Sequence, residues 1–508
     1  MSSRRGGGRR PSTNGSAKRQ ILVSVDPAET RVALLESGQT VECYIERRGQ
    51  QSVVGHVWKG RVTNVLAGME AAFVDVGLEK NGFLHVDEVV ALGVPRHKRR
   101  IAELLSKGDE VMVQATKDAM GTKGVRLTGQ LSLAGRYLVN VPYGNGVGIS
   151  KRLSDQERTR LRKICDPLAS DQGGLIVRTA AAGASEEEFQ RDLTHLRRLW
   201  TALQSRHEAA SAPALLYTEA DVSLRIIRDL LSEAVDEVLV DDPEQHQRIS
   251  QFLQRTSPGM ANRVRHYDEA EDMMRHLGVE AAISSTLERR APLPSGGYLV
   301  IDDTEAMTVI DVNSGRNVGK GKSRLEDTVT RTNLEAAREV VRQLRLRDIG
   351  GIVIIDFIDM DDAANRKAVK AALDDALEQD RTRTFVVDIS PLGLVEMTRQ
   401  NVFEGPREIM TEPCELCDGQ GRHLTDETLA VGVERTLRAK LASEGGTSSD
   451  ELVVRVHPRV AAILRDGDGE RLDEVAAAAG RPLNLMADAG LGTQDVALGE
   501  PVRVSRRR

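Results

Sequence analysis

Three short apolar runs lie between residues 297 and 360, and each stops at or just before acidic residues. The second, at 307–317, reads as a strand, and the third, at 352–360, is a continuous apolar run typical of a buried strand. Between these two runs, apolar residues recur at helical spacing, namely Leu334, Ala337, Val341 and Leu344. The pattern predicts two strands with a helix between them, with Asp311 and Asp356 near the strands' C-terminal ends.

The spacing of polar residues at these strand ends is typical of a metal site. Asn313 follows Asp311 by two residues, and residues i and i+2 of a strand point to the same face. If the strands are neighbours, Asp356 joins them and three oxygen ligands converge, which suits Mg²⁺. Such an ion polarises a phosphoryl oxygen and supplies a hydroxide nucleophile. The alternative is that the aspartates only end strands or begin turns, where Asp is common.

The segments VIDVNSGRN, NLEAAREVVRQLRLRDIGG and IIDFIDM together resemble the catalytic core of the bacterial ribonuclease E / ribonuclease G endoribonucleases. The resemblance implies that Asp311 and Asp356 hold a catalytic Mg²⁺ and that Asn313 supports the site. It implies hydrolysis of single-stranded, A/U-rich RNA to 5′-phosphate and 3′-hydroxyl ends. The expected roles are rRNA and tRNA processing and mRNA decay.

The same resemblance implies a multidomain α/β fold with a discontinuous ribonuclease H-like domain and a DNase I-like catalytic domain. Along the chain we expect a disordered basic arm (1–19), the first ribonuclease H-like segment (20–52), an S1 domain with the OB fold (53–133), a 5′-phosphate sensor region (134–219), the second ribonuclease H-like segment (220–290), the catalytic domain (291–410), a zinc link (411–424) and a small C-terminal α/β domain (425–508).

Composition bounds these expectations. A chain of 508 residues is too long for one core, and no apolar run approaches the roughly 20 residues of a membrane helix. Four cysteines do not make a disulfide scaffold, so we expect a reducing cytoplasm. Because the net charge is −6, any RNA contact must come from local basic patches. The arm at 1–19 has six basic residues and no acid, which is typical of a solvated tail with weak phosphate affinity.

Residues 57–89 resemble an S1 domain, an RNA-binding module with the OB fold. Phe73 and Phe83 fall in strands between glycines, and OB barrels stack bases on such aromatics with little sequence preference. A core role is the alternative for a strand phenylalanine. The resemblance favours RNA stacking, and it also implies that Lys117 and Lys123 grip the RNA backbone.

The segments SLAGRYLVNVP and GLIVRTAAAGASEEEF match a family region that senses a 5′-monophosphate on RNA. Recognition of a phosphate needs a bidentate cation and short donors, which Arg178 and Thr179 supply side by side at a strand end. Without the resemblance, this pair would read as ordinary surface polarity. The resemblance adds Gly135, Val139 and Arg383 to the pocket.

Cys414 and Cys417 have the spacing of a zinc knuckle, but tetrahedral zinc takes four ligands. Cys43 and Cys165 lie in other segments, and His423 is a candidate third ligand. The resemblance implies that two such pairs, from two chains, share one zinc and link the protomers into a homotetramer built as a dimer of dimers. The alternative is two reduced cysteines in a turn.

Two classes of function remain. One is a Mg²⁺-dependent endoribonuclease, and the other is a catalytically inactive S1-type RNA-binding scaffold. Asp311, Asn313 and Asp356 favour the enzyme, because a scaffold needs none of them. The S1-like region disfavours a phosphatase or a DNA nuclease. The chain stops after the small C-terminal domain, so we expect a compact protein, either ribonuclease G-like or a scaffold-less ribonuclease E catalytic core, with RNA-decay enzymes as further candidate partners.

Overall fold

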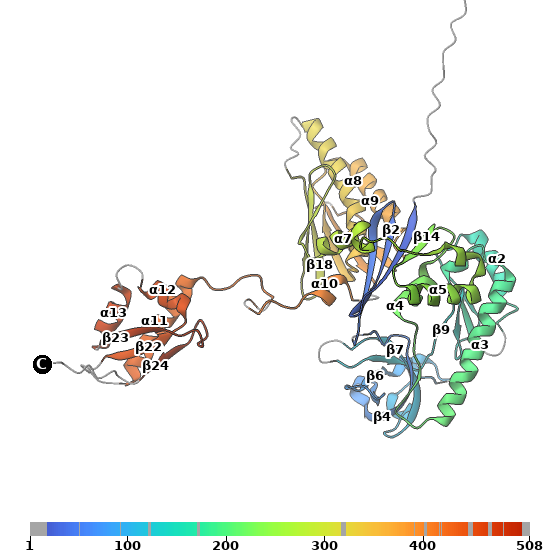
Figure 1. The fold of residues 1–508 in the computed structure, drawn as a ribbon, viewed down its shortest axis with the longest axis horizontal. Coiled ribbons are helices and arrows are strands. Elements are labelled where there is room, and N and C mark those ends of the chain that lie inside the picture. The colour runs from blue at the N-terminus through green and yellow to red at the C-terminus, as the bar shows by residue number, and fades with distance from the viewer. Residues whose placement is uncertain are drawn as a thin grey trace, which may run out of the picture. The chain divides into compact units, whose positions relative to one another are not determined.

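The computed structural model describes residues 18–49, 51–91, 93–119, 123–169, 173–315, 322–390, 392–400, 404–415, 417, 419–444, 451–465, 470–480 and 482–499. The chain divides into two compact units, residues 1–410 and 411–508 (Figure 1). Most of the expected basic arm, residues 1–17, lies outside the described residues. Among the described helices, none is both long and apolar enough to cross a membrane.

The first sheet of unit one combines segments from both ends of the region before residue 290. Its order is β15-β14-β1-β2-β3, with β1, β2 and β3 antiparallel and β14 and β15 parallel to β1. The strands are β1 (Arg19–Val25), β2 (Glu29–Glu36), β3 (Gln39–Arg47), β14 (Glu237–Val240) and β15 (Val264–His266). Helices α4 (Val222–Leu230) and α5 (Pro243–Thr256) share its core. This sheet therefore combines two distant segments of the chain, while the ribonuclease H-like domain stays a prediction.

A small barrel follows in the chain. Five strands pair in a ring, because β4 bonds to both β5 and β7. The ring contains β4 (Val57–Leu66), β5 (Ala71–Asp75), β6 (Gly82–His85), β8 (Arg126–Thr128) and β7 (Glu110–Lys117). This barrel-like sheet is consistent with the predicted OB fold. The sequence reasoning missed β13 (Ala214–Tyr217), which comes from the end of the sensor region and pairs with β4.

The sensor region forms a four-stranded sheet of order β11-β12-β10-β9 with two helices. Its elements are β9 (Leu133–Ala134), β10 (Leu138–Val141), β11 (Val147–Ile149), α2 (Asp155–Cys165), β12 (Gly174–Val177) and α3 (Glu186–Ala209). A capping box starts α3, because the Ser185 hydroxyl accepts from the Glu188 N–H and the Glu188 carboxylate accepts from the Ser185 N–H.

The last region of unit one is a six-stranded sheet of order β16-β17-β18-β19-β21-β20. Its strands are β16 (Arg290–Pro292), β17 (Tyr298–Asp303), β18 (Met307–Asn313), β19 (Gly351–Asp356), β20 (Thr384–Val386) and β21 (Leu394–Arg399). Helices α8 (Lys322–Leu346) and α9 (Ala363–Leu377) pack on one face and share its core (Figure 1). β18 and β19 are parallel, so α8 is the crossover that such a pair requires.

Short helices fill the connections of unit one, namely α1 (Ile101–Leu104), α6 (Met273–His276), α7 (Val279–Thr286) and α10 (Pro406–Met410). A buried ion-pair cluster joins the first sheet to α8. The Arg345 guanidinium bonds to Glu42 at 2.8 Å and to Glu36 at 3.1 Å. Arg381 also bonds to Glu42, at 2.8 Å. Buried charges persist only when paired, so these contacts fix how the two sheets dock.

Unit two contains one small α/β layer pair. Its sheet has the order β23-β22-β24, and three helices share its core. The elements are α11 (Asp426–Glu444), β22 (Leu452–Val456), α12 (Pro458–Arg465), α13 (Glu470–Ala479), β23 (Leu483–Ala487) and β24 (Val496–Leu498). β24 is a short antiparallel partner of β22.

Candidate active site

Two carboxylates lie side by side on the face of the six-stranded sheet that the helices leave free. Asp311 of β18 and Asp356 of β19 are direct register partners, and both are exposed. The Asn313 amide nitrogen donates to Asp311 Oδ2 at 2.8 Å. The structure therefore brings together the three residues that the sequence singled out, and Asn313 orients the Asp311 carboxylate.

Electrostatics at this site favour a cation. Partial desolvation raises the pKa of Asp356, and the negative charges of Asp311 and Asp359 raise it further. Like charges at close range disfavour ionisation of both groups, and a bound cation relieves that cost. No group of three or more His, Cys, Asp or Glu side chains suited to a metal occurs among the described residues. Mg²⁺ is commonly held by one or two carboxylates together with water and substrate phosphates, so the pair fits this ion.

The loop after Asp356 is held by α8 through residues that the sequence reasoning missed. The buried Asn333 side chain donates to Ile358 O at 2.8 Å and accepts from the Ile358 N–H at 3.2 Å. Glu326 accepts from the Asp362 N–H at 3.2 Å and from the Asn365 amide at 2.9 Å. Asn333 directly precedes Leu334 of the apolar periodicity in this helix, and a polar residue at that position was the available signal.

One row of side chains crosses the barrel on four neighbouring strands. Phe73 pairs with Phe83, Phe83 with Arg126, and Arg126 with Lys117. The two rings meet edge to face with centroids 6.0 Å apart, and both are half-buried. The two cations are exposed, as is Lys123. Sequence reasoning missed Arg126, which only the register of the short strand β8 aligns with the phenylalanines.

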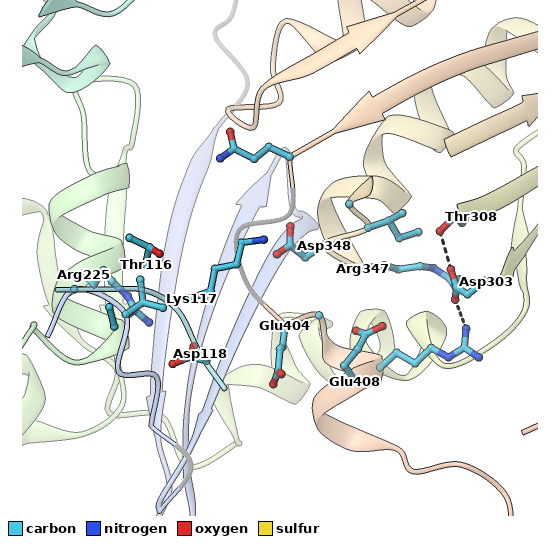
Figure 2. A pocket seen from close by; sticks show the side chains of 18 of the residues that line it. Thr116, Lys117, Asp118, Arg225, Asp303, Thr308, Arg347, Asp348, Glu404 and Glu408 are labelled. Atoms are coloured by element: carbon cyan, nitrogen blue, oxygen red, sulfur yellow. Dashed lines mark hydrogen bonds and ion pairs between the residues drawn. The ribbon is translucent and has the colours of Figure 1, made fainter. Parts of the chain in front are cut away.

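Lys117 also lines a cavity of about 740 Å³ between the barrel and the catalytic region of unit one. Figure 2 shows Lys117 and Asp118 on the barrel side, with Asp348, Glu404 and Glu408 on the other. On that second side, Asp303 accepts from Thr308 at 2.9 Å and from Arg407, as the dashed lines mark. The cavity thus lies at the Lys117 end of the row.

Arg178 directly follows β12 and is held on two sides. Its Nη1 donates to Gly135 O at 2.8 Å, and its Nη2 lies 2.5 Å from Asp229 Oδ1. The hydroxyl of Thr179 bonds to that of Ser150 at 2.8 Å. Gly135 has no room for a side chain, because a Cβ there would lie 2.5 Å from an oxygen of Asp192. The sequence reasoning missed Asp229, which comes from α4, a helix that packs on the first sheet.

The other two expected sensor residues lie on different elements. Val139 of β10 is the register partner of Ile176 on β12, two residues before Arg178, so it lies on the same sheet. Arg383 is an exposed residue just before β20. Arg152 of the sensor region donates to Thr382 O at 2.9 Å, next to Arg383. The structure thus brings Arg178, Thr179, Gly135 and Val139 together in the sensor region. The segment that carries Arg383 contacts the same region through Arg152.

The two cysteines of unit two form a tight turn. The Cys417 N–H donates to Cys414 O at 3.3 Å, and the Gly421 N–H donates to Cys417 Sγ at 3.2 Å. Cys414 is exposed and Cys417 is half-buried. His423 Nδ1 bonds to the adjacent Leu424 O at 2.9 Å. These residues offer two accessible sulfur ligands on one chain, which suits a zinc completed from elsewhere.

The other two cysteines have a different character. Cys43 lies in the core of the first sheet, and Cys165 lies in the core of the sensor region. Burial raises the pKa of Cys43 to about 12 and that of Cys165 to about 11. A metal ligand must be a thiolate, so these buried thiols are structural.

Comparison with known proteins gives matches along most of the chain. The ribonuclease E/G family model matches residues 132–402. Ribonuclease G of Escherichia coli (strain K12) is 39% identical over 478 residues, which cover 92% of this chain and 97% of that protein. Ribonuclease G of Haemophilus influenzae is 38% identical over 454 residues, 88% of this chain and 91% of that protein. Ribonuclease E of Escherichia coli (strain K12) is 37% identical over 435 residues, but these cover only 41% of that protein.

The exposed carboxylates, the barrel and these matches together define the class of the protein, which is an endoribonuclease acting on RNA. The chain belongs to the ribonuclease E/G family. The resemblance seen in the sequence is thereby confirmed, and the enzyme is favoured over the RNA-binding scaffold. The roles of the individual site residues stay predictions.

Proposed function

We propose that this endoribonuclease is Mg²⁺-dependent and cleaves single-stranded, A/U-rich RNA to 5′-phosphate and 3′-hydroxyl ends. It would act in rRNA and tRNA processing and in mRNA decay, in the cytoplasm. The observation that carries the proposal is the register pairing of Asp311 with Asp356 on an exposed sheet face. Two carboxylates so placed accept a cation while leaving room for a substrate phosphate.

Each step of the proposed mechanism rests on a residue of this chain. Bound Mg²⁺ supplies a Lewis acid and a means of activating water. Asp311 and Asp356 would hold the ion, with the Asn313 amide fixing the orientation of Asp311. The two hydrogen bonds between the Asn333 side chain and the Ile358 backbone keep the loop after Asp356 in place. This rigidity matters because catalysis depends on orientation within fractions of an ångström.

RNA would bind to the row of side chains that crosses the barrel. Phe73 and Phe83 offer ring surface for bases, and Lys117 and Arg126 offer charge for phosphates. Such contacts depend little on the base sequence of the RNA, which suits an enzyme that acts on single strands. Lys123, also exposed, is the further backbone contact that the family resemblance implies.

Stimulation by a 5′-monophosphate would depend on Arg178 and Thr179. Gly135 O and Asp229 fix the guanidinium, so that its orientation is set before a phosphate arrives. Val139 flanks the pocket on the same sheet, and Arg383 completes it from the adjoining segment. A phosphate there would bind by charge-assisted hydrogen bonds.

For the assembly we propose one zinc per two chains, held by Cys414 and Cys417 of each, in a tetramer built as a dimer of dimers. The support is that one chain presents two accessible thiols in a knuckle-like turn, which leaves two positions of a tetrahedral site open. The ribonuclease H-like and DNase I-like labels belong to the proposal too. The strand order β3-β2-β1-β14-β15 and the two-layer catalytic region are compatible with them.

The test is an assay of the purified full chain on a 5′-monophosphorylated, A/U-rich oligonucleotide, with Mg²⁺ and with EDTA. We expect cleavage only with Mg²⁺ and products that carry 5′-phosphates. Cleavage that persists in EDTA, or products with 5′-hydroxyl ends, would contradict the proposed chemistry. RNA binding without any cleavage would contradict the assignment of Asp311 and Asp356.

A further inference from the structure

The six-stranded sheet of the catalytic region has one buried and one accessible face. Burial alternates strictly along β18 and β21, and helices α8 and α9 cover the buried face. The accessible face carries Asp311 and Asp356. It also carries large apolar side chains that remain exposed among the described residues, namely Met307 (38% exposed), Ile352 (45%), Phe385 (69%) and Val387 (44%). Leu392, in the loop after β20, is 73% exposed.

Phe385 and Val387 lie along one edge of the sheet, and Leu392 lies in the loop that leads from there into β21. Phe385 pairs with Thr398 on β21, and the Val387 N–H donates to Glu396 O at 2.8 Å. Leu392 comes two residues before Leu394, the register partner of Asp356. We call Phe385, Val387 and Leu392 the edge track. The part of β21 from Thr398, the partner of Phe385, to Leu394 covers about 13 Å, at about 3.3 Å per residue.

The ends of the edge track coincide with two proposed RNA contacts. At one end, Phe385 follows Arg383, the expected contact with the 5′-phosphate, by two residues. At the other end, Gly393 O accepts from the Phe357 N–H at 3.3 Å, which ties the Leu392 loop to the residue after Asp356. The track therefore begins beside a cation and ends in the loop that bonds to the residue after Asp356.

We propose that the edge track is a stacking platform for the bases of single-stranded RNA between the 5′-sensing region and the scissile phosphate. This inference rests on the proposed function. Bases have apolar faces that pack on exposed aromatic and aliphatic side chains, while the backbone stays in water. An exposed Phe385 beside the exposed Val387 and Leu392 is suited to that role.

A second copy of the chain is the competing occupant of such a patch, because exposed apolar edges also pair with protein. The geometry points away from it. Phe385 and Val387 lie on the same face as Asp311 and Asp356, because Thr398, the partner of Phe385, and Leu394, the partner of Asp356, share a face of β21. A protein seated there would block the pair from substrate. RNA is the one partner that must reach this face.

The test compares Phe385→Ser, Leu392→Ser and Phe385→Trp with a control, Leu287→Ser, whose side chain is exposed outside every proposed site. Affinity for a fluorescein-labelled single-stranded oligonucleotide is measured in the Asp311→Asn background, and kcat/KM is measured with the carboxylates intact. We expect both serine variants to lose about tenfold in affinity and in kcat/KM, about 1.4 kcal/mol. Phe385→Trp should retain both, and its added tryptophan fluorescence should be quenched by RNA.

The outcomes separate this inference from the proposed function. If wild type cleaves RNA and the serine variants match Leu287→Ser in affinity and kcat/KM, the stacking platform is contradicted, while the proposed function is not. If a serine variant instead changes the oligomer's mass in light scattering, a protein contact occupies the patch and the inference fails. If wild type does not cleave, the proposed function fails, and the binding and quenching data still decide the track.

Discussion

Asp311 and Asp356 are register partners on the adjacent parallel strands β18 and β19, although the whole of helix α8 separates them in the chain. The right-handed crossover that joins parallel strands places their C-terminal ends at one edge of the sheet. A mixed sheet of this kind therefore gathers acidic strand ends without any sequence proximity. The reactive face stays accessible because both helices pack on the other side.

Replacing either carboxylate should abolish cleavage while leaving RNA affinity largely intact. Asp311→Asn or Asp356→Asn removes one negative charge from the proposed ion site, and we expect a loss on the order of 10²-fold or more in kcat. Single-turnover kinetics and binding titrations measure the two effects. Asp374→Asn, on the exposed side of α9, is the matched control. Near-wild-type cleavage by either site variant would contradict the assignment of Asp311 and Asp356 as the metal site.

Removing the Arg178 guanidinium should affect substrates according to their 5′ end. Arg178→Ala should slow cleavage of 5′-monophosphorylated RNA much more than that of 5′-hydroxyl RNA, because the lost charge-assisted bonds serve only a phosphate. The measurement is the ratio of kcat/KM for the two substrates. Arg191→Ala, on the exposed side of α3, should leave that ratio unchanged. Equal slowing of both substrates by Arg178→Ala would make Arg178 a structural partner of Asp229 only.

Removing the thiols of unit two should alter assembly. A Cys414→Ser, Cys417→Ser double variant should lose zinc and shift toward smaller species, since two chains no longer supply four thiolates. Activity should fall although both residues lie outside the carboxylate pair. Metal analysis and light scattering check this. A stoichiometry of one zinc per chain that depends on His423 would favour an intrachain site instead.

The Arg126 side chain should contribute one phosphate contact. Arg126→Ala should weaken RNA binding similarly for all sequences and lower the slope of log K against log salt by about 0.7, the value for one contact on a single strand. Binding titrations at several salt concentrations give this slope. Lys163→Ala, exposed on α2, should leave it unchanged. An unaltered slope for Arg126→Ala would contradict the proposed contact between Arg126 and an RNA phosphate.

The junction between the first sheet and α8 should be sensitive to acid. Burial alone would raise the pKa of Glu42, but the charges of Arg381 and Arg345 outweigh it, and the pKa is lowered. Its contribution to stability is therefore complete above the ordinary glutamate pKa of about 4.3 and is lost as pH falls through the lowered value. Glu42→Gln should cost about 3 kcal/mol at neutral pH, because Arg345 keeps only Glu36.

Urea unfolding of unit one, followed at several pH values, tests this prediction. The difference in free energy of unfolding between wild type and Glu42→Gln should shrink as the pH falls below about 4. Glu208→Gln, exposed on α3, serves as the control and should show no such difference. A gap that stays constant down to low pH would mean that the charge of Glu42 does not stabilise the junction.

The sequence by itself determined the elements and the candidate chemistry. The spacing of Asp311 and Asn313 set them on one strand face, and the apolar periodicity placed α8 between two strands. The knuckle spacing of Cys414 and Cys417 was likewise local. These features follow from the periods of helix and strand, which involve only near neighbours in the chain.

Only the tertiary structure decided which distant segments meet. The partnership of Asp311 with Asp356, the alignment of Arg126 with Phe83 and the contact of Arg178 with Asp229 all depend on strand register and on docking between layers. The same holds for β13, which leaves the sensor region to pair with the barrel. Local pattern cannot fix these pairings, because a strand presents the same alternation to any partner, and long-range packing selects one of them.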